Sequence, residues 1–310
     1  MKLIKIAAFS FLLITAMASC RKEDPLGNAA DIPGLGGDST ATTPIDIWIH
    51  DSLVIPYNID VKYRWNQFTT DLISDNVVPP KEDVVIPVMS SLLRIWATPY
   101  INETNLIFFN KIAPKFFVLS GSSAAGPDGA TVGLAGGGRQ INLLQLNYFK
   151  NKTSPDYTLA DTSIQRNVFL TVHHEFSHIF DQLKRRPNAF DIITQSDYSA
   201  DWINIQDPDA WQKGFVSAYA SSVATEDFAE MISHMLVYGK PQWDAFVASI
   251  VMEVDDGTGT GNTILVPNTD AQNKLKAKEA AIVNYFKTSW NIDFYDLQAK
   301  VRASIEKEFY

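Results

Sequence analysis

The sequence has 310 residues, of which 46% are hydrophobic and 12% aromatic, so the chain can bury a substantial core. Its 35 acidic residues outnumber 26 basic ones, and the formal net charge is −9 at pH 7. This acidic balance, with no basic stretch, argues against binding to nucleic acid or lying along anionic lipid. The single cysteine excludes a disulfide within the chain.

The first twenty residues have the pattern of an export signal. Lys2 and Lys5 supply a positive start, and the apolar run that follows is shorter than the about 20 residues of a membrane span. The run ends in Met17-Ala18-Ser19-Cys20, which resembles the lipobox recognised by bacterial lipoprotein signal peptidase. The resemblance implies that residues 1–19 are a signal peptide and that Cys20 carries lipid. A plain secretory signal cleaved nearby is the alternative.

Residues 20–43 are expected to form a lipidated flexible tether. The segment is rich in Gly, Pro, Ser, Thr and Asp, and it buries too little apolar surface to offset its ordering entropy. Arg21-Lys22-Glu23-Asp24 is either part of this solvated tether or similar to the export signals of surface-exposed Gram-negative lipoproteins. We therefore expect an outer-membrane lipoprotein that contacts the membrane through its lipid anchor only.

Residues 44–310 are expected to form one globular domain, with an N-terminal lobe at 44–160 that mixes strands with a helix. Apolar residues at helical spacing predict a helix over 82–97, with Pro87 near its start. Alternation and β-propensity predict three strands, at 59–65, 115–121 and 139–148. The last of these is either an exposed edge, open to an extended peptide, or an ordinary internal strand.

The C-terminal lobe, 161–310, is expected to be helical. Its first helix should begin near Asp161-Thr162 and carry an apolar stripe formed by Val168, Val172, Phe176, Ile179 and Leu183. Further helices are predicted at 226–239, 242–253, 270–289 and 293–308, with a loop from Asp255 to Thr269.

His174-Glu175-Phe176-Ser177-His178 falls within the first of these helices and reads H-E-x-x-H. Residues at i and i+4 lie on the same helix face, so His174 and His178 can reach one metal ion. Glu175 can then reach a water bound to that metal. His173 points about 100° away around the helix and is expected to be a bystander.

A catalytic zinc normally takes three protein ligands, so two histidines leave it incomplete. The metzincin pattern is excluded, because Asp181 and Lys184 stand where it needs Gly and His. Glu226 and Glu230 lie one helical turn apart further along, so one can bind the metal while the other supports a ligand imidazole. An alternative assignment makes Glu230 or His234 the third ligand.

His174–Asp181 followed by Tyr219–Glu230 resembles the gluzincin arrangement, and specifically the catalytic domain of anthrax toxin lethal factor. The resemblance implies that Glu226 is the third zinc ligand, that Tyr219 stabilises the transition state, and that Glu230 supports a ligand from behind.

Over most of 44–310 the chain is also similar to zinc-binding metallopeptidase lipoproteins associated with TonB-dependent, Sus-like import systems. The residues that carry this likeness are the lipobox, Tyr63-Arg64-Trp65 and the run from Glu226 to Glu230. The likeness implies components of a TonB-dependent importer as partners.

Together these features predict an α+β, zincin-like (gluzincin) fold that holds one catalytic Zn²⁺ and hydrolyses a peptide or protein substrate. In that mechanism zinc lowers the pKa of a bound water, Glu175 takes its proton, and Tyr219 donates to the developing oxyanion. Asp181 is expected to add support behind a ligand. The alternative function is a zinc-containing binding accessory of an outer-membrane importer with little or no hydrolytic activity.

Overall fold

The computed structural model describes residues 43–64, 77–123, 133–136, 140–159, 162–259 and 261–310. The compact unit of the chain runs from Pro44 to Tyr310. The expectations for the signal peptide, for Cys20 and for the tether fall on residues outside the described ranges, as does that for Trp65.

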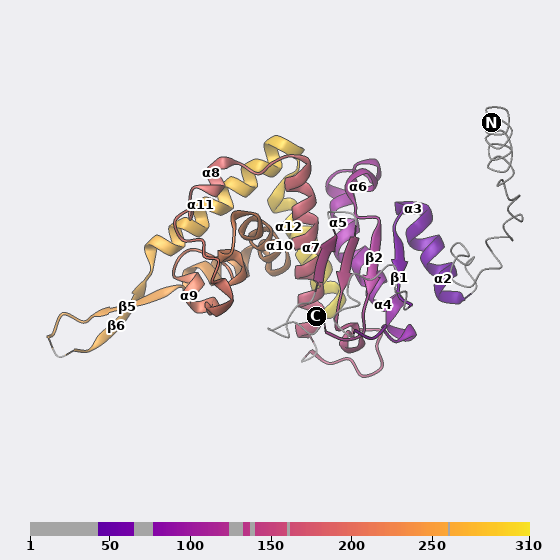
Figure 1. The fold of residues 1–310 in the computed structure, drawn as a ribbon, viewed down its shortest axis with the longest axis horizontal. Coiled ribbons are helices and arrows are strands. Elements are labelled where there is room, and N and C mark those ends of the chain that lie inside the picture. The colour runs from indigo at the N-terminus through magenta and orange to yellow at the C-terminus, as the bar shows by residue number, and fades with distance from the viewer. Residues whose placement is uncertain (1–42, 65–76, 124–132, 137–139, 160–161, 260) are drawn as a thin grey trace, which may run out of the picture. The chain divides into compact units, whose positions relative to one another are not determined.

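A four-stranded sheet forms the centre of the N-terminal part, in the order β1-β2-β4-β3 (Figure 1). Its strands are β1 (Asp60–Lys62), β2 (Phe116–Leu119), β3 (Gly133–Gly136) and β4 (Gln140–Leu143). β1, β2 and β4 are parallel, whereas β3 runs antiparallel to β4. The three predicted strands are therefore present, each shorter than expected.

Among the described strands, β1 and β3 are the two edges of this sheet, and the strand predicted at 139–148 is the internal one of its two alternatives. β4 pairs with β2 on one side and β3 on the other, so it is internal. The sequence Gly-Leu-Ala-Gly of β3 has no β-branched residue, and its strand conformation comes from the ladder with β4 rather than from local propensity. β3 and β4 both contact the helix that carries the H-E-x-x-H motif.

Short helices surround the sheet. They are α2 (Pro44–Ile49), α3 (Ile55–Tyr57), α4 (Glu82–Leu92), α5 (Thr98–Glu103) and α6 (Leu106–Ile112). A π-helical turn over Leu93–Ala97 joins α4 to α5, so the predicted helix continues six residues beyond 97. Pro87 lies inside α4 rather than at its start. By length and composition Glu82–Glu103 could cross a membrane, yet 56% of its most apolar window is buried inside the protein, as in a core helix.

The C-terminal part is mostly helical, and with the sheet it confirms the α+β class. Its helices are α7 (Thr162–Leu183), α8 (Asn188–Asp191), α9 (Asp207–Trp211), α10 (Ala224–Ser249), α11 (Thr269–Tyr285) and α12 (Phe294–Phe309). A π-helical turn over Phe286–Trp290 extends α11. Four residues of the predicted α7 stripe are buried, but Leu183, at the last position of the helix, is 56% exposed.

α10 spans two of the predicted helices. The run is interrupted at Gly239, whose φ of 74° and ψ of 165° are not helical and are accessible to glycine at little cost. Two helices therefore meet at a kink there, with Pro241 two residues later, and the break predicted between 239 and 242 is confirmed.

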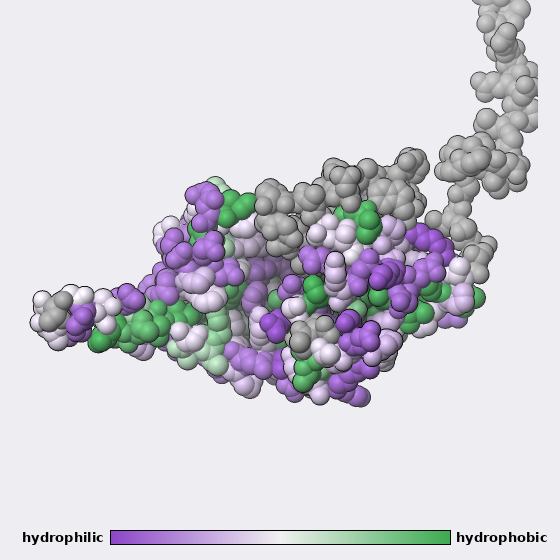
Figure 2. Space-filling model, turned by 90° about the horizontal axis from the view of Figure 1, so that it is seen from below, coloured by the Kyte–Doolittle hydropathy of each residue, from purple (hydrophilic) through white to green (hydrophobic). Residues whose placement is uncertain are grey.

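A hairpin replaces the loop predicted from Asp255 to Thr269. β5 (Val251–Asp255) pairs antiparallel with β6 (Thr263–Pro267), and in Figure 1 the hairpin projects away from the helices. The glycines between the strands suggested a loop, whereas the cross-strand partners show a ladder. Figure 2 shows hydrophobic residues along this projection, and Met252, Ile264 and Leu265 are exposed.

An aromatic cluster packs against one side of α7. The ring of Phe176, within the H-E-x-x-H motif, lies edge-on to Trp96 at 5.3 Å and to Tyr100 at 4.9 Å. Phe180, one turn later, contacts both Phe176 and Tyr100. All four side chains are almost fully buried. The apolar side of α7 is thus held by the N-terminal part of the chain, while another side of the helix packs on α10.

Candidate metal centre

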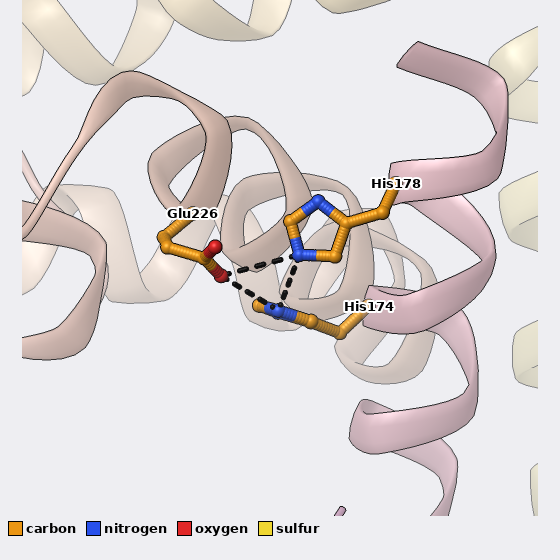
Figure 3. Close-up of side chains that lie close together, drawn as sticks. All are labelled: His174, His178 and Glu226. Atoms are coloured by element: carbon orange, nitrogen blue, oxygen red, sulfur yellow. Dashed lines mark hydrogen bonds and ion pairs between the residues drawn. The ribbon is translucent and has the colours of Figure 1, made fainter. Parts of the chain in front are cut away.

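Two histidines of α7 and one glutamate of α10 meet between these helices (Figure 3). Nε2 of His174 lies 3.0 Å from Nε2 of His178, because the two residues stand one turn apart on the same face. Oε2 of Glu226 lies 3.0 Å from the first nitrogen and 3.2 Å from the second. Glu226 occupies the first turn of α10.

The spacing of these three atoms fits a common metal ion. In a tetrahedral zinc site with bonds of about 2.0–2.1 Å, ligand atoms lie about 3.3 Å apart, close to the observed separations. Hydrogen bonding alone accounts for the triangle poorly, since each imidazole nitrogen offers at most one proton and cannot bond well to two neighbours at once. His174, His178 and Glu226 could therefore hold a metal ion.

Glu230 lies one turn after Glu226 and supports the far side of His174. Its Oε1 is 2.8 Å from Nδ1 of His174, an ion-pair contact without the alignment of a hydrogen bond. Ser217 donates a hydrogen bond of 2.7 Å to the other carboxylate oxygen. Burial alone would raise the pKa of Glu230, but His174 and His234 outweigh it and lower this pKa to about 2. Glu230 is thus an ionised partner of a candidate ligand.

The charges around the cluster favour a cation. Burial alone would lower the pKa of His174, but the carboxylates of Glu226 and Glu230 raise it to about 10. Burial would likewise raise the pKa of Glu226, but the two imidazoles hold it well below its usual range. The carboxylates therefore stabilise positive charge at Nε2 of His174, whether a proton or a metal ion supplies it.

Glu175 is buried beside the candidate ligands. Burial is the main cause that raises the pKa of its carboxyl group; the neighbouring histidines oppose the rise and the other two glutamates add to it. Its side chain has no hydrogen-bond partner among the described residues. A carboxylate with a raised pKa and free lone pairs is suited to take a proton from a water molecule.

Tyr219 lies beside the cluster, in a 3₁₀ turn over Tyr219–Ser221. Its ring is stacked against the imidazole of His174 at 5.9 Å and contacts the edge of Trp202 at 4.9 Å. Burial and the nearby Glu226 carboxylate raise the pKa of Tyr219, so its hydroxyl stays protonated and remains a donor. The side chain is 38% exposed, so a bound molecule can reach it.

Two other candidates, Asp181 and His234, and the predicted bystander His173 lie outside the triangle of His174, His178 and Glu226. Asp181 accepts a 2.7 Å hydrogen bond from the backbone of Arg186 and pairs with its guanidinium group, so it orders the chain after α7 instead of supporting a ligand. His173 is fully buried against Tyr100, and burial lowers its pKa to about 3. Nδ1 of His234 bonds to the backbone oxygen of Glu230, so the alternative ligand His234 is not in the triangle.

Trp202 and Ser217 contribute to the site but carry no sequence signal. Trp202 belongs to a 3₁₀ turn over Trp202–Asn204, and Ser217 precedes Tyr219 by two residues. Neither residue stands in a recognisable motif. Only the packing of these segments against α7 and α10 brings them to the cluster.

Comparisons with known proteins identify the family of the chain. Residues 38–295 match the model of a family described as a putative zinc-binding metallo-peptidase. The chain is also similar to a crystal structure of a putative zinc-binding metallo-peptidase from Bacteroides caccae, with a TM-score of 0.63 and 26% sequence identity over 83% of this chain and 89% of that one. No match was found among curated proteins. Since the family model covers most of the sequence, the chain belongs to the family of putative zinc-binding metallo-peptidases.

Proposed function

We propose that the chain is a zinc-dependent endopeptidase of the gluzincin type. The observation that carries this proposal is the triangle of Nε2 of His174, Nε2 of His178 and Oε2 of Glu226, with separations of 3.0–3.2 Å. The name shared by the family and by the Bacteroides caccae protein supports zinc as the metal.

The neighbouring residues divide the work of peptide hydrolysis between them. His174, His178 and Glu226 would hold the zinc ion, which would supply Lewis acidity and lower the pKa of a water molecule to about 7. Glu175 takes the proton of the attacking water and passes a proton to the leaving amine. The hydroxyl of Tyr219 donates a hydrogen bond to the carbonyl oxygen as negative charge develops on it. Glu230 keeps the imidazole of His174 oriented.

The edge strand β3 supports a peptide as the substrate. β3 contacts α7 and pairs with β4 on one side only among the described strands. An extended peptide can add to such an edge through its backbone groups, with little demand on its side chains. A peptide aligned along β3 would lie beside the helix that carries the metal ligands.

We also propose that the protein is an outer-membrane lipoprotein anchored through Cys20. This rests on the lipobox-like sequence Met17–Cys20. The lipobox and the resemblance to import-associated lipoproteins likewise support components of a TonB-dependent importer as partners.

The substitution Glu175→Gln tests the peptidase proposal. It keeps the shape of the side chain and removes the base, so zinc content should stay at about one per chain while casein cleavage falls by about 10² to 10⁴-fold. Glu253→Gln, on the exposed strand β5, is the matched control and should keep full activity. Undiminished casein cleavage by Glu175→Gln would rule out the proposed mechanism.

A further inference from the structure

Asp227 follows the candidate ligand Glu226 and points into the protein instead of toward the metal centre. Its Oδ2 lies 2.6 Å from Nζ of Lys278 on α11, and neither side chain is exposed to solvent. The hydroxyl of Tyr198 donates a 2.8 Å hydrogen bond to the same oxygen. The first turn of α10 is therefore tied to α11 through a buried ion pair.

Lys278 makes a second buried contact. Its Nζ donates a 2.8 Å hydrogen bond to the backbone oxygen of Gly214 and lies 4.2 Å from the centre of the Phe215 ring. Gly214 has a φ of 86°, and the stem of Lys274 packs where a side chain would begin. The backbone at Gly214 is thus closely confined against α11.

The segment that begins at Gly214 carries two groups of the metal centre. Ser217 donates to Glu230, and Tyr219 stacks on His174. The ammonium group of Lys278 consequently joins both supports of the site, α10 through Asp227 and the segment 214–219 through Gly214.

We propose that Lys278 is a positioning residue for the metal centre, which sets the place of Glu226 and of the segment 214–219 relative to α7. The inference rests on the proposed function only in taking the triangle as the zinc site. It names a residue that lies 52 positions after Glu226 and touches none of the three candidate ligands.

Stability alone is a weak reason for this arrangement. Taking both charges out of water is costly, and replacing a buried ion pair by apolar residues is often neutral or stabilising. A site that must hold its groups within about 0.5 Å does gain from such a fixed connection. Because the ammonium binds both a carboxylate and a backbone oxygen, it adds a buried connection between two segments that also meet through the hydrogen bond from Ser217 to Glu230.

Lys278→Met tests the inference, since methionine keeps most of the volume and removes the ammonium. The zinc dissociation constant, measured by competition with a chelating dye well below the melting temperature, should rise by about 10- to 100-fold. In protein stripped of metal, amide hydrogen exchange should become faster in residues 214–219. Lys276→Met is the matched control: it removes an ammonium group from an exposed position of the same helix and should change neither readout by more than about twofold.

The double variant Asp227→Asn/Lys278→Met separates positioning from stability. It leaves no lone charge in the interior, so its melting temperature should exceed that of Lys278→Met, while zinc affinity should stay weak because the bond to Gly214 is still missing. Zinc affinity that recovers together with the melting temperature would overturn the inference, as would unchanged affinity and exchange in Lys278→Met.

If the wild-type chain bound zinc without cleaving peptides, the proposed function would fail and these measurements would still decide the role of Lys278. If it bound no zinc, the exchange measurement would decide it.

Discussion

The α7–α10 contact and the β5–β6 hairpin break the usual pattern of burial in opposite ways. Between α7 and α10, ionisable side chains such as His174 and Glu175 are buried. On the hairpin, apolar side chains such as Ile264 and Leu265 are exposed. Buried charge is costly unless each group finds a partner, whereas a few exposed apolar residues are ordinary on a protein surface.

The difference shows which part of the chain buries ionisable groups at a cost in stability. In the α7–α10 contact, His174 and Glu226 each contact two ionisable neighbours, and the aromatic cluster around Phe176 packs behind them. In the hairpin, two strands pair with each other and with no third described strand. We therefore expect substitutions in the first region to affect both metal binding and folding, and equivalent substitutions in the second to affect neither.

The largest expected effect is the loss of zinc from Glu226→Ala. With one of three protein ligands removed, zinc content after dialysis should fall from about one per chain to below about 0.1, as measured by inductively coupled plasma mass spectrometry. Glu253→Ala removes an acidic side chain from the hairpin and should leave zinc content unchanged. Full metal content in Glu226→Ala would show that the assignment of the third ligand is wrong.

The next effect contrasts two apolar side chains. Phe176→Ala should lower the free energy of unfolding by about 3–5 kcal/mol, because it leaves a cavity in the aromatic cluster. Leu265→Ala, at a hairpin position that is 66% exposed, should change it by less than about 0.5 kcal/mol. Urea unfolding of both variants with zinc present measures the contrast. Equal losses would mean that the hairpin is part of the folded core.

Removing the metal should have a smaller and local effect. With free zinc at 100 times the dissociation constant, binding stabilises the folded chain by about 2.7 kcal/mol, and a chelator should remove that amount. Amide exchange should then become faster at the contact between α7 and α10 but not in β5 and β6. A melting temperature that does not respond to the chelator would argue against a tightly bound metal.

The smallest effect concerns a half-buried polar contact, which is less buried than the α7–α10 contact and less exposed than the hairpin. Glu308 of α12 accepts hydrogen bonds from Ser91 at 2.6 Å and from Arg94 at 2.7 Å. Burial would raise the pKa of Glu308, but these donors lower it overall, so its contribution to stability is present above the usual glutamate pKa of about 4.3 and is lost as pH falls below that value.

Glu308→Gln should therefore cost about 1 kcal/mol at pH 7, since the half-exposed Arg94 is screened by solvent. The difference from wild type should shrink toward pH 3. Urea unfolding at both pH values measures it. A difference that grows on acidification would mean that the sign of this pKa shift is wrong.

Local patterns in the sequence predict the parts of the fold that depend on local geometry. The placement of His174 and His178 on one face follows from helical periodicity, and α7 spans the motif as expected. The approach of Glu226 to both histidines was expected from the family resemblance, since no local rule brings together residues about fifty positions apart. The break in α10 at Gly239 follows from local Gly and Pro signals and was predicted. The ladder between β5 and β6 depends on cross-strand pairing, which explains why the sequence predicted a loop there.

The supporting residues were the hardest to predict. Asp181 has the residue type and position of a supporting acid, yet Arg186 binds its carboxylate. Ser217, Trp202 and Lys278 act through contacts between segments far apart in the chain, and none of them belongs to a motif. The two histidines of the motif can thus be placed from their spacing, whereas the residues that support them depend on how the segments pack.

The most direct test of the account is an anomalous difference map at the zinc absorption edge from crystals of the zinc-loaded protein. If His174, His178 and Glu226 hold zinc, the map should contain one strong peak per chain, about 2.0–2.2 Å from Nε2 of His174, Nε2 of His178 and a carboxylate oxygen of Glu226. A map with no peak there, or with its strongest peak bound by other residues, would contradict it.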